Sequence, residues 1–244
     1  MVNFVSALGF LTIIPMPAKA FRVDGRQIIY FPMVGLLIGG LLFGVDKLGA
    51  LYATQEIRVV ADIMFLAIIS GALHLDGLAD SADGLFSHRP KEKILEIMQD
   101  SRIGVMGALA VFFCLTLKMA GLSGLTGPGY EIWLFIAPAL ARTSQVIGLV
   151  FMDYARREGG KSQIFFQRKK YQLLALGIIP IALPFWIAIE TGILVLLLFL
   201  SGTALMLWFF QKAIGGITGD TLGALTEVME CVLFLTGALI LKHG

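Results

Sequence analysis

Residues 74–104 read HLDGLADSADGLFSHRPKEKILEIMQDSRIG, and this stretch places an acidic stripe directly after an apolar segment. Asp76, Asp80 and Asp83 are separated by four and three residues, so on a helix their carboxylates share one face about two turns long. Three like charges on one face repel each other, and a bound cation relieves that repulsion. Hard oxygen ligands at this spacing suit Mg²⁺ or Mn²⁺ that also binds phosphate. The stripe therefore predicts a metal site for phosphate chemistry.

A solvated loop rich in Asp and Gly is the alternative interpretation of this stretch. Two features favour a site. The apolar run Val59 to Leu75 is predicted to continue into the stripe as one helix without a turn, and the residues between the acids are small, which allows close backbone approach. Asp100 then adds a fourth carboxylate, with Arg102 beside it, after a short amphipathic segment that begins at Pro90. A metal and a guanidinium together indicate phosphate binding.

The composition predicts that this site lies in a membrane protein. Apolar residues make up 57% of the 244 residues, charged residues only 15%, and the mean hydropathy is +0.86; soluble domains are about 25% charged. The formal charge of +2 favours the lipid bilayer as partner over nucleic acid. Cys114 and Cys231 lie in separate apolar runs, which indicates packing rather than a disulfide framework. We expect one integral membrane catalytic domain over residues 1–244.

The apolar runs predict an all-α polytopic membrane bundle of about seven transmembrane helices, with interfacial helices at the N-terminus (1–14) and after Pro90. The expected spans are about 31–45, 59–75, 104–120, 132–152, 172–188, 192–210 and 222–241.

Basic residues predict the orientation of this bundle. Residues 156–170 are the most basic segment, which the positive-inside rule places in the cytoplasm. Counting spans then puts the N-terminus, residues 76–103 and residues 211–220 on the same side, with 14 of the 19 Lys and Arg residues. Lys118 is expected near the outer end of its span. Arg142 is the exception, because it falls mid-span; it is either a functional residue or part of a structural ion pair with the acids of the last span.

A second group of polar residues opens the last span. Residues 215–223 read GGITGDTLG, followed by Glu227 and Glu230. A Gly-rich turn at a helix start is predicted to offer free backbone N–H groups to an anion. The alternative is that Asp220 only caps the helix, but two glutamates in an apolar span make that explanation incomplete.

The chain resembles the cobalamin synthase family, the adenosylcobinamide-GDP ribazoletransferases. The matching strings extend over most of the chain: FLTIIPMP at 10–17, FPMVGLLIG at 31–39, GALHLDGLADSADGL at 71–85, DSRIG at 100–104 and GGITGDTLGALTE at 215–227. The resemblance implies an Mg²⁺-dependent transferase that joins adenosylcobinamide-GDP to α-ribazole or its 5′-phosphate. The products are then adenosylcobalamin or its 5′-phosphate, and GMP. It also implies a multi-pass protein of the cell inner membrane with a cytoplasmic active site, and it leaves room for a homo-oligomer and for contacts with other cobalamin-assembly enzymes.

Combining the resemblance with the residues assigns expected roles. Metal ligands are Asp76, Asp80, Asp83 and Asp100; catalytic residues are Asp76, Arg102 and Glu227; substrate-binding residues are His74, Arg89, Gly104, Arg142, Gly216, Thr218, Gly219 and Asp220.

A looser likeness connects the stripe to the CDP-alcohol phosphotransferases. Their pattern begins DxxDG, which Asp80, Asp83 and Gly84 fit, and Arg89 and Asp100 fall near its later positions. The final Asp is absent, because Gly104 stands about where it belongs. The general base is therefore left open between Asp76 and Glu227, and phospholipid synthesis remains an alternative function. A cation-coupled transporter is the second alternative, although the chain shows no internal repeat and its acids sit at a membrane boundary.

Overall fold

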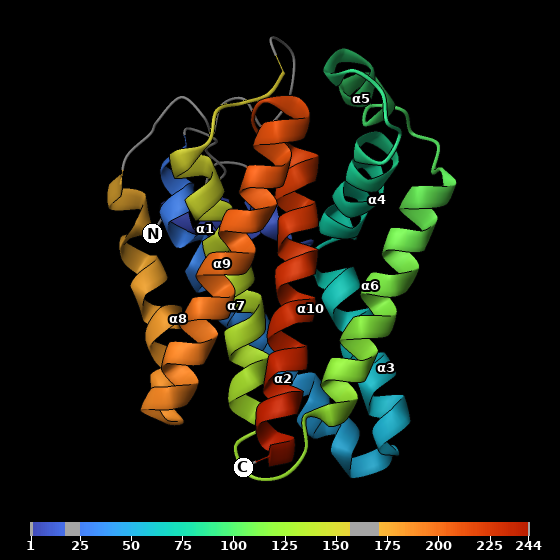
Figure 1. The fold of residues 1–244 in the computed structure, drawn as a ribbon. Helices are drawn as coiled ribbons and strands as arrows, with labels where there is room; N and C mark the ends of the chain where they lie inside the picture. Colours follow the sequence, from blue (N-terminus) through green and yellow to red (C-terminus); the bar gives the residue numbers. More distant parts are fainter. Residues whose placement is uncertain (1, 18–24, 157–170, 244) are drawn as a thin grey trace.

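Helices dominate the computed structural model, which describes residues 2–17, 25–156 and 171–243. Two long helices, α7 (Glu131–Phe151) and α10 (Gly219–His243), run through the centre of the bundle (Figure 1). Helices α2 (Phe31–Tyr52), α6 (Val105–Gly124) and α9 (Ile189–Ile214) surround them. In the most apolar 18-residue stretch of each helix, 83% of the residues are buried in α7 but only 28% in α6 and in α9. Helices α6 and α9 therefore present most of their apolar side chains to the outside, as lipid-facing helices do.

The predicted all-α membrane bundle is confirmed, with fewer long spans than expected. Within the described residues, five helices are long and apolar enough to cross a bilayer, and a sixth span results if the bent pair α3 (Gln55–Ile69) and α4 (Leu73–Leu85) counts as one. The shorter helices are α1 (Val2–Leu11) at the N-terminus and α5 (Lys91–Ile97) after Pro90.

The prediction that the apolar segment and the acidic stripe form one continuous helix is wrong. Helices α3 and α4 meet at 84° across residues 70–72. Gly71 and Ala72 both have left-handed backbones, with φ of 59° and 56°, and such residues end an α-helix. The Ile13 N–H donates to the Ile69 carbonyl at 2.8 Å and so satisfies part of the exposed helix end. The acidic stripe is consequently a separate helix, turned away from the axis of α3.

The expected span at 172–188 is also not a regular transmembrane helix. It consists of a 3₁₀ turn (Tyr171–Gly177), the short α8 (Ile178–Ala182) and a second 3₁₀ turn (Leu183–Trp186). Pro180 and Pro184 explain the interruption, because proline lacks the N–H that a helix needs and its ring clashes with the preceding turn.

Glycines let the central helices approach at backbone distance. A Cβ atom on Gly39 of α2 would lie 2.6 Å from the Leu134 carbonyl oxygen of α7, and one on Gly35 would meet the backbone of Pro138 and Ala139. Small residues spaced four apart allow this kind of close packing between membrane helices.

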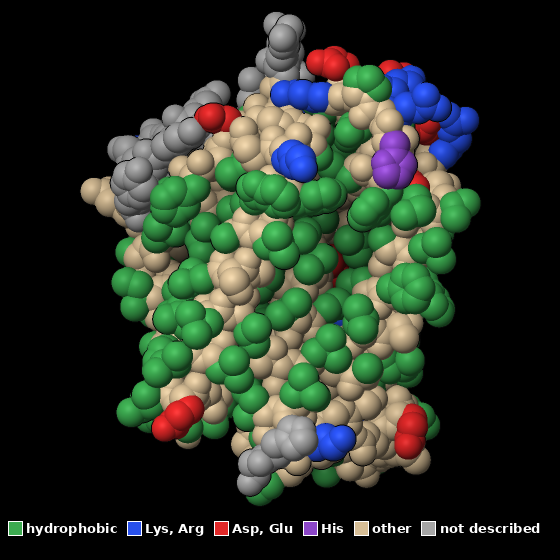
Figure 2. Space-filling model, viewed as in Figure 1, with side chains coloured by type: hydrophobic (Ala, Val, Ile, Leu, Met, Phe, Trp, Pro, Cys, Tyr) green, Lys and Arg blue, Asp and Glu red, His purple; other side chains and the backbone are tan. Residues whose placement is uncertain are grey.

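Polar contacts join the loops at each of the two ends of the bundle. At one end, the Ala155 N–H donates to the Ile217 carbonyl and the Ile217 N–H to the Asp153 carbonyl, each at 2.9 Å. At the other end, Lys47 pairs with Glu131 at 2.8 Å. Figure 2 shows charged side chains at these two ends and a mainly apolar belt between them. The expectation that residues 76–103 and 211–220 share an end with the segment after α7 is confirmed, because Arg156 pairs with Asp220 and α5 lies at the same end (Figure 1). Residues 18–24 and 157–170, which hold seven of the 14 Lys and Arg residues expected on this side, lie outside the described residues.

Gly39→Val should lower the free energy of unfolding by about 1–3 kcal/mol, because the added methyl groups have no space against α7. Gly44→Val is the matched control on the same helix, where a Cβ meets nothing within 4 Å. Thermal unfolding in detergent micelles measures both. Equal losses for the two variants would show that β-branching, and not the α2–α7 contact, sets the cost.

Candidate functional site

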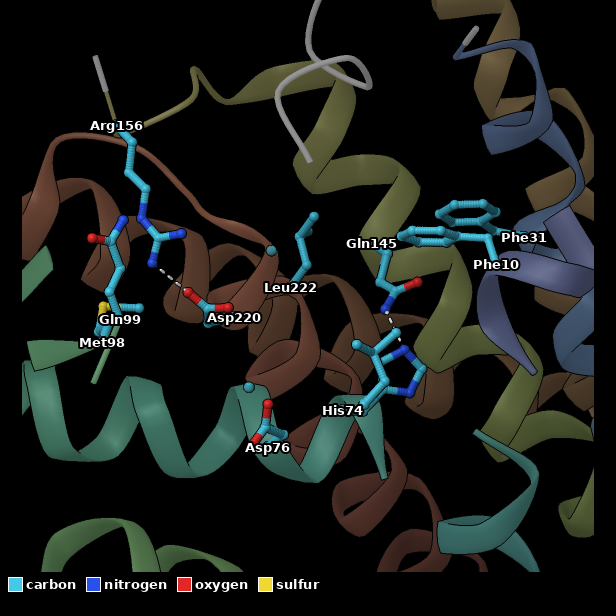
Figure 3. A pocket seen from close by; sticks show the side chains of 13 residues that line it. Phe10, Phe31, His74, Asp76, Met98, Gln99, Gln145, Arg156, Asp220 and Leu222 are labelled. Atoms are coloured by element: carbon cyan, nitrogen blue, oxygen red, sulfur yellow. Dashed lines mark hydrogen bonds and ion pairs between the residues drawn. The ribbon is translucent and has the colours of Figure 1, made fainter. Parts of the chain in front are cut away.

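A cavity of about 490 Å³ opens at the end of the bundle that carries α5 and the start of α10. Figure 3 shows side chains from several helices around it: Asp76 and His74 from α4, Asp220 and Leu222 from α10, Gln145 from α7, and Phe10 and Phe31 from α1 and α2. Met98, Gln99 and Arg156 complete the outer side. The acidic stripe and the Gly-rich turn, far apart in sequence, thus contribute to one space.

The outer end of the cavity is charged. The Asp220 carboxylate lies 2.7 Å from Nη2 of Arg156, and the Thr218 hydroxyl donates to the same carboxylate at 3.3 Å. Asp76 lies on α4 on the side that faces the start of α10 (Figure 3). Asp80, one turn further along α4, interacts electrostatically with Asp76 and Asp220. Two carboxylates from two helices and one guanidinium therefore line this end, and Asp80 lies outside the lining.

Gly77 accounts for the closeness of the two helices here. A Cβ atom at Gly77 would lie 2.7 Å from the carbonyl oxygen of Asp220. Any other residue would push α4 away from the first turn of α10 and would separate Asp76 from Asp220.

Asp83 and Asp100, the other two expected metal ligands, already have partners. The Asp83 carboxylate accepts the N–H of Gly104 at 2.6 Å and that of Gly107 at 2.8 Å, so it caps the first turn of α6. Arg102 binds Asp100 through two nitrogens, at 3.0 and 2.5 Å, and holds the pKa of that carboxyl down at about 2. No three His, Cys, Asp or Glu side chains of the described segments lie close enough to hold a metal ion by themselves.

Arg102 and Arg89, two expected phosphate- or substrate-binding residues, lie outside the cavity lining. Arg102 and Asp100 border a neighbouring depression with Lys93, and Gln99 borders both spaces. Arg89 is exposed in the connection between α4 and α5.

The Gly-rich turn uses several of the backbone donors that were expected to be free. The Thr218 N–H donates to the Thr221 hydroxyl at 2.8 Å, and the Thr221 N–H to the Thr218 hydroxyl at 3.2 Å. Thr218 therefore caps α10 and is fully buried, whereas Asp220 points to Arg156. Gly216 lets the segment at Asp153 approach, because a Cβ there would collide with the Asp153 carbonyl oxygen. Of the turn residues, Gly219 and Asp220 line the cavity.

A buried charge network lies deeper in the bundle. Lys118 of α6 contacts Glu227 at 2.7 Å and Glu230 at 2.5 Å, and Arg142 of α7 pairs with the other oxygen of Glu230. All four side chains are at most 5% exposed. The prediction that Arg142 meets the acids of the last span is confirmed, and Lys118, in the second half of α6, is buried against the same acids. Two cations balance two carboxylates. Glu227 pairs with Lys118, Arg142 pairs with Glu230, and neither Glu227 nor Arg142 lines the cavity.

Several residues that line the cavity were not among the predicted site residues. They are Phe10, Phe31, Met98, Gln99, Gln145 and Arg156. Arg156 was counted only as part of the basic segment 156–170. A polar residue inside an apolar span was the available signal for Gln145.

Comparison with known proteins gives a consistent result over nearly the whole chain. The family model described as cobalamin-5-phosphate synthase matches residues 3–238. An adenosylcobinamide-GDP ribazoletransferase of Alkaliphilus metalliredigens is 38% identical, covering 98% of this chain and 97% of that protein. The protein of the same name from Clostridium novyi is 35% identical, with 96% of both chains covered. No solved structure matches the chain.

Lys118→Met should destabilise the protein by about 3–5 kcal/mol, because it leaves two buried carboxylates with only one cation. The double variant Lys118→Met/Glu227→Gln restores the charge balance and should lose less than Lys118→Met alone. Chemical unfolding in detergent measures both free energies.

Lys93→Met is the control for this comparison, because its ion pair with Glu96 is solvent-exposed and should contribute little. Glu227→Gln is also measured alone. If the double variant loses as much free energy as Lys118→Met and Glu227→Gln lose together, the four side chains do not act as one balanced network.

Proposed function

The chain belongs to the cobalamin-5-phosphate synthase family, and from this membership we propose that it joins adenosylcobinamide-GDP to α-ribazole or α-ribazole 5′-phosphate. It is a transferase of cobalamin synthesis; the products are adenosylcobalamin or its 5′-phosphate, and GMP. The observation that best supports the proposal is that Asp76 of α4, Asp220 of α10 and Arg156 line the same cavity. Family membership favours this reaction over the phospholipid synthase and the transporter considered from sequence.

The transfer exchanges one phosphorus–oxygen bond for another. A ribose hydroxyl oxygen of α-ribazole attacks the phosphorus nearer the cobinamide, the bond from that phosphorus to GMP breaks, and the hydroxyl proton passes to a carboxylate. Asp76 is the carboxylate we assign to this proton, since Glu227 is paired with Lys118 away from the cavity. Of the two residues that the sequence offered as the general base, Asp76 and Glu227, we therefore propose Asp76.

Arg156 is the residue we assign to the diphosphate of the donor. It is the cation among the described residues that line the cavity, and its buried Nε has no hydrogen-bond partner within the part of the chain that the structure describes. A guanidinium binds phosphate oxygens through several N–H groups at once. Arg156 can therefore keep one nitrogen on Asp220 and present others to the departing GMP.

Mg²⁺ is the cofactor we propose, with Asp76 and Asp220 as its protein ligands and the phosphates of the substrate as further ligands. Proteins usually bind Mg²⁺ through one or two carboxylates, with substrate phosphates and water as the other ligands, so a complete protein cage is not required. The close approach of α4 and α10 at Gly77 brings Asp76 and Asp220 to the same end of the cavity. Both carboxylate oxygens of Asp83 and of Asp100 are already hydrogen-bonded to other groups. When bound, the ion neutralises charge on the diphosphate.

The location we propose is the cell inner membrane, with one catalytic domain over residues 1–244 and the cavity open to the cytoplasm. The support is charge sorting: the cavity lies at the end where Arg156 precedes the basic segment 157–170 and where α5 carries Lys91 and Lys93. Nucleotide substrates are also made in the cytoplasm, so this orientation gives them direct access.

Asp76→Asn should reduce turnover by about 10²-fold or more, because a cavity carboxylate that accepts the proton and binds metal is lost. Asp83→Asn should instead lower the free energy of unfolding by about 1–2 kcal/mol and keep measurable turnover, because its carboxylate caps α6. Release of GMP from adenosylcobinamide-GDP, and thermal unfolding of each variant, are the two measurements.

Glu92→Gln is the charge-matched control, because it removes an exposed carboxylate of α5 at the same end of the bundle. Equal losses for Asp76→Asn and Glu92→Gln would show that only the general negative charge of this end matters, and a near-normal rate for Asp76→Asn would show that the cavity is not the site.

A further inference from the structure

The inner end of the cavity differs in chemistry from its charged outer end, the mouth of the cavity. Phe10, from the end of α1, and Phe31, from the start of α2, lie with ring centroids 6.0 Å apart and planes within 9° of parallel. His74 of α4 and Gln145 of α7 lie beside them (Figure 3). Neither side chain belongs to the charged group at Asp220. This end therefore combines an aromatic wall with two neutral polar side chains.

Gln145 and His74 are joined to each other and leave hydrogen-bonding capacity unused. Nε2 of Gln145 lies 3.1 Å from Nε2 of His74, and Oε1 of Gln145 has no partner among the described residues. Nδ1 of His74 also lacks one within the described part of the chain. The side chains are only 4% and 2% exposed. Exchanging the amide oxygen and nitrogen of Gln145 changes which atom is unpaired and leaves one unpaired in either case.

An unpaired buried polar atom costs about 1–3 kcal/mol, and a ligand that donates a hydrogen bond removes this cost. Figure 3 shows the Gln145 oxygen turned toward the side where Phe10 and Phe31 lie. A molecule that satisfies this oxygen would thus place its remaining surface against aromatic rings. A flat ring that carries a hydroxylated group fits both features.

The charge distribution separates the two substrates. Among the described residues lining the cavity, Arg156 is the one Lys or Arg, and it lies at the mouth beside Asp220. Phosphate groups belong at that mouth, and the uncharged part of a ligand belongs at the inner end. Guanine presents several donors and acceptors along its edge that a mainly apolar wall would leave unpaired. The methylated benzimidazole of α-ribazole has no N–H donor, and its ribose supplies hydroxyls.

We infer that the inner end, formed by Phe10, Phe31, His74 and Gln145, binds the acceptor nucleoside. The benzimidazole ring lies against the aromatic wall and a ribose hydroxyl donates to Oε1 of Gln145. The identity of this nucleoside rests on the proposed function; the preference for an uncharged aromatic nucleoside rests on the cavity. The ribose then points from the inner end toward Asp76, and the donor diphosphate enters from the side of Arg156.

Gln145→Leu tests this placement by equilibrium binding without turnover. Titration calorimetry of purified protein should show α-ribazole binding weakened by about tenfold, the equivalent of one neutral hydrogen bond, and GMP binding unchanged. Leucine keeps the volume, and the loss of the hydrogen bond to Nε2 of His74 is offset by removal of the unpaired Oε1, so the fold should hold. Phe10→Leu is the second variant and should also weaken α-ribazole selectively, because it removes part of the aromatic wall.

Phe43→Leu is the matched aromatic control, because Phe43 packs on Phe135 away from the cavity. If Gln145→Leu weakens GMP and leaves α-ribazole unchanged, the inner end holds the donor's guanosine and the inference is wrong. If neither ligand responds to Gln145→Leu or Phe10→Leu, the inner end binds no nucleoside. A wild-type protein that releases GMP in the presence of α-ribazole while these variants bind normally would overturn the inference alone; a wild-type protein without that reaction would overturn the proposed function.

Discussion

Four charged side chains buried between three helices impose the strongest constraint on this structure. Lys118, Arg142, Glu227 and Glu230 come from α6, α7 and α10, and none of them can lose its partner without leaving a charge in a medium that solvates it poorly. The network therefore fixes the rotation and the depth of these helices relative to one another. Because α10 carries both glutamates, its first turn, with Asp220, is held in one position at the cavity.

Helix α4 is placed against that turn by two backbone features. The left-handed residues at 71 and 72 end α3 and redirect the chain, and Gly77 allows α4 to touch the backbone of Asp220. The result is a cavity with a charged outer end and an uncharged inner end. A reaction between a nucleotide-activated donor and a nucleoside acceptor needs such a division, since its two substrates must be held in line at the reacting atoms.

Much of this arrangement was predictable, and the remainder has physical reasons. Helical periodicity predicted the class, the stripe on α4 and the pairing of Arg142, because apolar spans leave few partners for a buried charge. The break before α4 was missed, since it depends on the chain near Ile13 packing against Gly71. Spacing shows which face the Asp83 carboxylate occupies, but it cannot show that Gly104 and Gly107 at the start of α6 donate to that carboxylate. Gln145 and Arg156 became candidates only when the fold brought them to the cavity.

The most direct measurement follows one phosphorus atom through the reaction. Adenosylcobinamide-GDP labelled at the phosphorus nearer the cobinamide is incubated with purified protein, Mg²⁺ and α-ribazole, and the corrinoid and nucleotide products are separated. The account predicts that all of the label stays with the corrinoid, now joined to α-ribazole, and that the released GMP is unlabelled. Label recovered in free GDP, with no α-ribazole joined to the corrinoid, would contradict it.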